Sequence, residues 1–315
     1  MNRAGVSVNR MRPGFFRRFY MDLYRHRAIY IMLIPVVAYY LIFCYWPMYG
    51  VVIAFKNYKP RIGIIQSPWL GLAHFQSFFS SMYFGRVLRN TLLISGYSLI
   101  FGFPIPIAFA ILLNEVKSAG YKKIIQTVTY LPHFITTVII CSLILQFTNA
   151  DGFITKIVNR FTGETMSLIG NYRSFRTIYV LSGIWQGFGW GSIIYLAAMM
   201  GINPELYEAA HIDGANKFRQ ILHVTLPGIS TTIVIMFVLA CGGLMNVGWE
   251  KTFLLQSPLT FETSDVISTY VYRKGFEDMD YSYSAAVGFF NSIVNITLLT
   301  VANMMSRRLS ETSLW

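Results

Sequence analysis

Six stretches of mostly apolar residues recur along the chain, separated by polar segments. They run at about residues 28–51, 90–113, 124–147, 177–202, 228–247 and 284–305. A helix needs about 20 mostly apolar residues to cross the hydrocarbon core of a bilayer, and each stretch meets that length. The pattern therefore predicts an all-α integral membrane protein, a bundle of six transmembrane helices within residues 28–305.

The composition supports this class. Of the 315 residues, 54% are hydrophobic and only 13% are charged, with a mean hydropathy of +0.48. Soluble domains carry about 25% charged residues, and disordered chains are poor in apolar ones. A soluble enzyme and a disordered chain are both disfavoured. The first stretch is too long for a signal-peptide core and has no A-x-A cleavage site, so we expect it to be retained.

The net charge is +12, and the basic residues flank the spans unevenly. They gather in residues 1–27, in the loop 114–123 and in residues 306–315. If the chain crosses the membrane six times, these three segments lie on the same side of it. Basic residues favour the cytoplasmic side, so we expect residues 1–27 and 306–315 to be cytoplasmic tails. The opposite loops carry both signs. The chain has no basic stripe with interleaved aromatic residues, so the sequence does not indicate nucleic-acid binding.

The loop at residues 203–227 carries signals for two short helices. Asn203 is a good N-cap, Pro204 suits the first helical position and Glu205 the first turn, so a helix should run to about Asp213. Gly214 can end it with a positive φ. A second helix should begin near Ala215. Its less polar face would hold Phe218, Ile221, Leu222 and Thr225, while Lys217, Arg219, Gln220 and His223 point elsewhere.

Small residues leave part of the first short helix bare, so another surface can approach it closely. That surface is either the underside of its own membrane bundle or a separate protein. The run Glu208-Ala209-Ala210, Asp213-Gly214-Ala215, Phe218, Ile221 and Leu226-Pro227 resembles the EAA motif of ABC importer permeases, EAA---G---------I-LP. In that family the motif forms the coupling helix, which docks on a cytoplasmic ATPase subunit. The residues expected to couple are Glu205, Glu208, Ala209, Ala210, Asp213, Gly214 and Ala215.

Further stretches are similar to sugar permeases of the maltose-importer family, and within it to the polysaccharide type. They are Tyr45–Gly50, Gly102–Pro104, Leu113–Val116, Tyr130–Phe134, Ser182–Trp185 and Asp265–Arg273. The resemblance implies a type I importer permease fold in a bacterial inner membrane. It also implies a heterodimer with a second permease, two ATPase subunits, an extracytoplasmic solute-binding protein and an oligosaccharide substrate, including acidic fragments such as alginate.

No catalytic or metal-binding set is apparent. The chain has no GxxxxGK[ST] phosphate loop, so ATP and Mg²⁺ would be used by the partner ATPase and this chain needs no cofactor. Cys44, Cys141 and Cys241 lie singly in apolar stretches and indicate neither disulfides nor a metal site.

Polar and aromatic side chains inside the spans are candidates for a substrate pathway, because amides bond hydroxyls and aromatic faces suit sugar rings. They are His133, Trp185, Gln186, Trp190, Asn246, Asn291 and Asn295. The same residues can hold helices together, and Trp can lie at the membrane interface. His133 follows Pro132 and can instead bond a carbonyl that the kink frees.

Three other functions compete with the importer reading. An ATP-independent secondary transporter or channel for a polar solute would need intramembrane charges, and these spans have almost none. A membrane-embedded enzyme would need a catalytic set at the interface. An export permease is disfavoured by the import-type loop.

Overall fold

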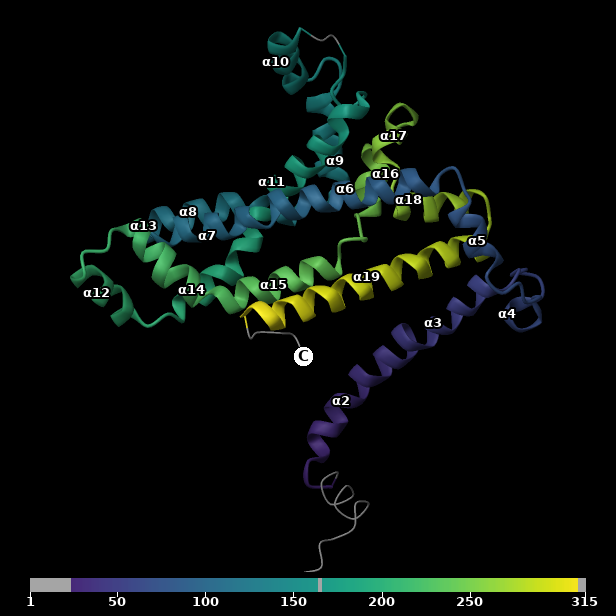
Figure 1. Ribbon diagram of the computed structural model, residues 1–315, viewed down its shortest axis with the longest axis horizontal. Coiled ribbons are helices and arrows are strands. Elements are labelled where there is room, and N and C mark those ends of the chain that lie inside the picture. The colour runs from purple at the N-terminus through teal and green to yellow at the C-terminus, as the bar shows by residue number, and fades with distance from the viewer. Residues whose placement is uncertain (1–23, 164–165, 311–315) are drawn as a thin grey trace, which may run out of the picture. The chain divides into compact units, whose positions relative to one another are not determined.

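The computed structural model describes residues 24–163 and 166–310 (Figure 1). Over these residues every regular element is a helix, and the only strand-like pairing is an isolated bridge between Lys56 and Trp69. The prediction of an all-α fold is confirmed. The chain divides into two compact units between Val52 and Ile53, and each is described by itself.

The first unit is a nearly continuous helix. It comprises α2 (Arg27–Tyr39), the π-helical turn η1 (Tyr40–Tyr45) and α3 (Trp46–Met48), and η2 (Tyr49–Phe55) crosses the boundary. None of the residues in α2, η1 or α3 is buried within this chain. A helix that is apolar on all sides requires an apolar surrounding, which a bilayer supplies. The first expected span is therefore a helix long and apolar enough to cross a membrane.

The second unit begins with the short helices α4 (Gly63–Gln66) and α5 (Ala73–Phe79), which precede the second expected span. That span is α6 (Phe84–Gly102) followed by α7 (Pro104–Asn114). Proline has no N–H to donate, so Pro104 interrupts the helical hydrogen bonds and begins a new helix after Phe103.

The third expected span, residues 124–147, is not one helix. It is divided into α8 (Ala119–Tyr130), the 3₁₀ turn η3 (Leu131–Phe134) and α9 (Thr137–Thr148), and α10 (Phe153–Thr162) follows. Pro132 begins the turn, and Ile135 and Thr136 then adopt extended backbone, with ψ of 132° and 148°. The break is thus larger than the kink that a single proline predicts.

The rest of the chain runs back and forth along a long helix, α11 (Tyr172–Met200), which packs on α6, α7 and α8. The elements that follow α11 in the chain are α12 (Pro204–Ile212), α13 (Lys217–Gln220), η4 (Ile221–Thr225), α14 (Leu226–Gly228), α15 (Ser230–Gly242), α16 (Trp249–Leu255), η5 (Pro258–Thr260), α17 (Phe261–Ser264), α18 (Ile267–Tyr272), η6 (Arg273–Glu277) and α19 (Tyr281–Ser310). The close approach of α8 to α11 depends on Gly189, where a Cβ would lie 2.2 Å from the Thr129 carbonyl oxygen.

Among the described residues, four helices are long and apolar enough to cross a membrane: Arg27–Phe55, Phe84–Asn114, Thr137–Thr162 and Tyr281–Arg308. A fifth is obtained if Lys217–Gly228 and Ser230–Gly242, bent by 63°, form one span. The fourth expected stretch forms α11, which is 29 residues long but does not reach the same apolarity. The prediction of a multi-helix membrane bundle is confirmed, while the number six stays a prediction.

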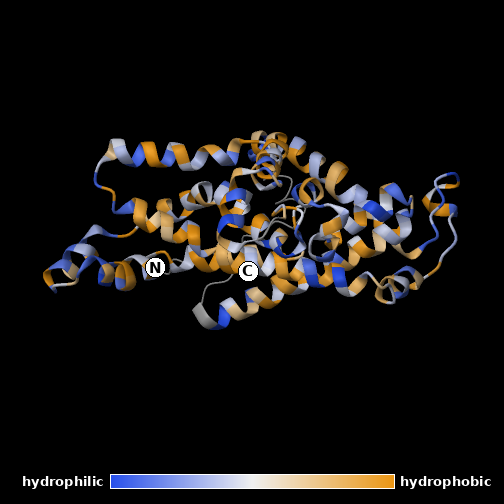
Figure 2. Cartoon of the chain, turned by 90° about the horizontal axis from the view of Figure 1, so that it is seen from above, coloured by the Kyte–Doolittle hydropathy of each residue, from blue (hydrophilic) through white to orange (hydrophobic). Residues whose placement is uncertain are grey.

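Apolar residues occur all along the long helices, including their outward faces (Figure 2). Buried clusters hold the second unit together. One lies among α5, α6, α18 and α19, another among α9, α11 and α16, and a third among α7, α11 and α15. The clusters fix two regions that matter for function: the α12 loop at one end and the segment from α16 to α18.

Candidate functional site

The first short helix of the loop forms as its sequence predicts. Asn203 Oδ1 accepts a hydrogen bond from the Glu205 N–H (3.1 Å), and its Nδ2 donates to Glu205 Oε2 at the same distance. The helix ends at Ile212, and Gly214 has a φ of +73°, a conformation that glycine adopts without strain. The N–H of Ala215 then donates to the Ala210 carbonyl (2.9 Å). Local residues thus set where this helix begins and ends.

The second helix differs from the prediction. It begins at Lys217, because Asn216 rather than Ala215 caps it and accepts from the Arg219 N–H (3.0 Å). Gln220, expected to point away, is buried and donates to the Ala215 carbonyl, while Phe218 is 73% exposed. The following turn, η4, is π-helical. A π-helical turn has a longer hydrogen-bond spacing, so it rotates later residues away from an α-helical face.

The α12 helix has no buried residue. Two large apolar side chains on it, Leu206 and Ile212, are 54% and 86% exposed. It is tied to the following segment by a 3.0 Å hydrogen bond between the hydroxyls of Tyr207 and Thr225. A connector packed against the underside of its own bundle would bury these apolar residues, and this chain leaves them uncovered.

The predicted coupling residues all lie on or directly after α12. Those exposed are Glu205, Glu208, Ala209, Asp213 and Gly214, and those half-buried are Ala210 and Ala215. In Figure 1, α12 lies at the end of the second unit that is remote from α18. Lys217, just beyond, forms an exposed ion pair with Glu115 at the end of α7 (3.0 Å), so the loop contacts the end of the second expected span.

The predicted pathway residues fall into separate groups. His133 stacks face to face on the Trp190 indole, with ring centroids 4.7 Å apart and planes within 2°. Gln186 Nε2 makes a long contact (3.5 Å) with the Ile135 carbonyl, in the extended break before α9. These three side chains hold η3 against α11. Trp185 lines a different, largely apolar cavity of about 660 Å³ beside α9 and α10.

Three asparagines meet between the end of α15 and α19. Asn246 Oδ1 accepts from Asn291 Nδ2 (3.2 Å) and from Asn295 Nδ2 (3.0 Å). Asn295 is buried, and its Oδ1 accepts from the Met245 N–H (2.9 Å), so its role is to join the two helices. Asn246 is exposed and lines a cavity of about 290 Å³, together with Ser95 and Ser98 of α6.

An aromatic group that the sequence analysis did not single out begins three residues after Asn246. Trp249 stacks on Tyr272 (5.3 Å between centroids) and Tyr272 on Phe276 (5.2 Å), with Phe253 edge-on to Tyr272. Trp249 and Phe276 are exposed. Trp249 follows Asn246 by three residues. The spacings Trp249–Phe253 and Tyr272–Phe276 were visible as i, i+4 pairs, but their mutual contact was not.

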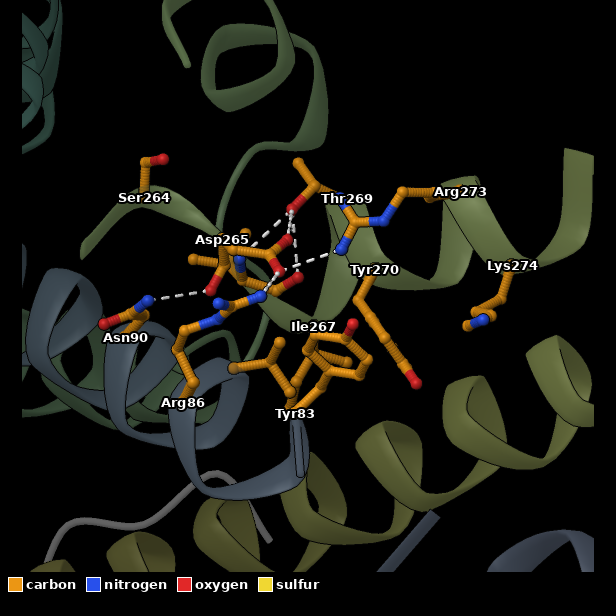
Figure 3. Close-up of polar contacts among 12 residues, drawn as sticks. Tyr83, Arg86, Asn90, Ser264, Asp265, Ile267, Thr269, Tyr270, Arg273 and Lys274 are labelled. Carbon is orange, nitrogen blue, oxygen red and sulfur yellow. Dashed lines mark hydrogen bonds and ion pairs between the residues drawn. The ribbon is translucent and has the colours of Figure 1, made fainter. Parts of the chain in front are cut away.

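Asp265 forms the second feature that sequence reasoning missed (Figure 3). Its carboxylate is fully buried and accepts from Arg86 of α6 (3.1 Å) and from Arg273 (2.8 Å), while Thr269 Oγ1 donates to it at 3.2 Å. Asn90 Nδ2 donates to the Asp265 main-chain carbonyl (3.0 Å). This network, the Asp265 node, joins α6 to α17 and α18 and so fixes the segment that carries the aromatic group.

A family model described as binding-protein-dependent transport system inner membrane component matches residues 102–311. Protein LplB of Bacillus subtilis (strain 168) is 42% identical over 93% of this chain and 92% of its own length. The polygalacturonan/rhamnogalacturonan transport system permease protein YteP of the same organism is 40% identical over 95% and 94%.

The fold has a solved counterpart. A chain in the crystal structure of a bacterial ABC transporter involved in the import of the acidic polysaccharide alginate matches with a TM-score of 0.85 and 42% identity, over 93% of this chain and 99% of that one. A second such structure, of an alginate ABC transporter in complex with alginate pentasaccharide-bound periplasmic protein, matches with a TM-score of 0.86.

Proposed function

This chain belongs to the inner membrane components of binding-protein-dependent transport systems, and we propose that it pairs with a second permease to import an acidic oligosaccharide. It is a membrane-spanning permease subunit of an ABC importer, a family in which ATPase activity resides in separate subunits. The proposed assembly adds two ATPase subunits, which use ATP and Mg²⁺, and an extracytoplasmic binding protein. In this proposed assembly both termini of the chain lie in the cytoplasm.

The exposed α12 helix is the single observation that carries the coupling proposal. Leu206, Ala209 and Ile212 present a small, apolar, solvent-exposed face at one end of the second unit. An ATPase surface that covers this face removes it from water, and closure of the ATPase dimer then moves α12. Transport follows because ATP binding favours one of two permease conformations, which is a shift of population between two states.

The substrate proposal is supported by relatives and by side-chain chemistry. Two of the relatives are described as acting on polygalacturonan/rhamnogalacturonan and on the acidic polysaccharide alginate. In this chain Trp249, Tyr272 and Phe276 form a stacked aromatic group, and Asn246, three residues before Trp249, accepts a hydrogen bond from Asn291. Aromatic faces take the C–H faces of sugar rings, and amides bond their hydroxyls. We place the sugar pathway along these residues.

Copurification tests the assembly. The tagged chain, extracted from native membranes in mild detergent, should bring down a second permease and an ATPase at one ATPase copy per permease. The ATPase activity of the reconstituted complex should rise with binding protein loaded with a uronate oligosaccharide and not with the unloaded protein. A folded chain that copurifies without an ATPase would contradict the coupling proposal. A complex stimulated only by a neutral oligosaccharide would contradict the substrate class alone.

Substitutions at Gly214 test the coupling loop. Its φ of +73° is costly for a β-branched residue and tolerable for asparagine, and open space surrounds the position where a Cβ would lie. Gly214→Val should therefore distort the end of α12 and reduce uptake strongly, while Gly214→Asn should retain most of it. Both variants should reach the membrane in equal amounts. Equal uptake by both would show that the shape of this turn does not matter for coupling.

A further inference from the structure

A groove lies between α6–α7 and α11, and none of its lining residues lines the cavity that holds Asn246. Its volume is about 550 Å³. One wall is a stripe of Tyr97, Phe101 and Ile105, spaced at i, i+4 and i+8, and all three are partly exposed. Leu181 and Ile184 line the opposite wall. Eight residues of helix make this apolar wall about 12 Å long.

One end of the groove is basic. Arg173 and Arg176 of α11 both line it. Arg176 Nη2 donates to Asn90 Oδ1 (2.7 Å), and its Nε is buried with no hydrogen-bond partner. Among the described residues, no carboxylate lies within ion-pair distance of Arg176, and the Asn90 side chain is already held by main-chain carbonyls of the α17–α18 segment. A buried N–H without a partner is costly, so this guanidinium has capacity for another acceptor.

The position of the basic end in the membrane decides what can reach it. Arg176 directly precedes the fourth apolar stretch and Asn90 begins the second, so the guanidinium lies where the spans leave the hydrocarbon. The walls of the groove continue into the apolar region. The molecules that surround such a site are lipids, which have an anionic or zwitterionic headgroup at this level and acyl chains below it.

We propose that this groove binds an anionic phospholipid. Its phosphate accepts hydrogen bonds from Arg176, since a guanidinium presents N–H groups in a fork that matches phosphate oxygens. One acyl chain lies along the stripe of Tyr97, Phe101 and Ile105, where it covers apolar surface that the chain leaves open. The positive charge of the guanidinium favours a headgroup with net negative charge over a zwitterionic one. The lipid would brace α6 against α11, next to the Asp265 node.

Native mass spectrometry of the intact importer complex tests this site. The complex is reconstituted in vesicles of equal parts phosphatidylglycerol and phosphatidylcholine and is then extracted in mild detergent. The detergent is removed from the complex in the gas phase of the mass spectrometer. Wild-type complex should retain phosphatidylglycerol adducts in preference to phosphatidylcholine. Arg176→Gln should reduce that retention about tenfold, the effect of losing one charge-assisted contact. Arg160→Gln is the matched control, because Arg160 is exposed on α10 and does not line the groove.

A second variant separates loss of charge from misfolding. Leu181→Trp keeps both arginines but fills the groove, and it should also reduce phosphatidylglycerol retention while the complex stays assembled. Retention unchanged in both variants would overturn the proposal, and so would equal retention of the two lipids by wild type. Cross-linking of Leu181→Cys to the second permease would overturn it too, because the groove would then be a subunit interface.

Discussion

At the residue scale, the Lys251 amine forms no ion pair with a carboxylate of the described residues. Its Nζ donates to the Tyr179 main-chain carbonyl (3.0 Å) and lies 4.7 Å from the centroid of the Tyr179 ring. Lys251 belongs to the loop after the fifth expected span, and burial lowers the pKa of its amine from 10.5 to about 8.

Titration of Lys251 should therefore differ from that of a lysine on the same loop. Competitive labelling with acetic anhydride, read by mass spectrometry, should give Lys251 a midpoint near pH 8. Lys274 is the control, since its hydrogen bond to Asp278 raises the pKa of its amine. The direction in which stability changes with pH follows from the number of protons that the folded and unfolded chains bind. Between pH 8 and 10.5 the unfolded chain binds more protons at Lys251, so folding becomes more favourable as the pH rises through that window. Equal midpoints for the two lysines would contradict the buried position of Lys251.

Single residues were predictable where their partners are near in sequence. Asn203 and Gly214 act on a helix that they themselves begin and end, so the caps and the positive φ could be inferred from residue type. The contact of Asp265 with Arg86 and that of Lys251 with the Tyr179 carbonyl could not, because those partners lie 179 and 72 residues away. Only packing brings Arg86 to Asp265, and no local pattern encodes that pairing.

At the element scale, the Asp265 node fastens the α17–α18 segment to α6. The Asp265 side chain is fully buried, whereas those of Arg86 and Arg273 are 33% and 24% exposed. A buried carboxylate with no cation is strongly unfavourable, but here either arginine alone still compensates it. The two arginines should therefore be redundant in part, and their loss should be non-additive.

A double-mutant cycle measures this redundancy. Arg86→Met and Arg273→Met should each lower the unfolding midpoint in detergent slightly. Together they should destabilise the protein by about 3–5 kcal/mol, the cost of a buried charge left unpaired. Lys274→Met, which breaks an exposed pair with Asp278, should cost less than about 1 kcal/mol. A double variant no worse than the sum of the two single ones would contradict shared compensation.

The ends of a helix were predictable where the length of an apolar stretch sets them. They were not predictable where a local change of backbone conformation interrupts such a stretch. The first, second and sixth stretches correspond to helices that can span a membrane. The third does not form one helix, because the chain extends at Ile135 and Thr136 after the proline turn. Both residues are β-branched, which favours extended backbone, but that preference is too weak to predict a break inside a long apolar stretch. The i, i+4 pair Asn291 and Asn295 was visible, but its convergence on Asn246 depends on the packing of α15 on α19.

At the scale of the whole molecule, the proposed function requires α12 and the α16–α18 segment to face opposite sides of the membrane. The two lie toward different ends of the second unit (Figure 1), as an importer needs, since ATP is used on one side and sugar arrives on the other. The basic residues near α7 and α8 predict that the α12 side is cytoplasmic. Cysteine accessibility can test this assignment.

Two exposed aspartates serve as reporters, Asp151 in the loop before α10 and Asp213 after α12. Cys44 is exposed and is replaced by Ala, while the buried Cys141 and Cys241 can remain. A membrane-impermeant maleimide should label Asp151→Cys in intact cells and Asp213→Cys only after permeabilisation. Both should react fully in detergent, which controls for burial. Labelling of Asp213→Cys in intact cells would place α12 outside, where no cytoplasmic ATPase can dock on it. Labelling of Asp151→Cys alone would fix both loops in the arrangement that coupling requires.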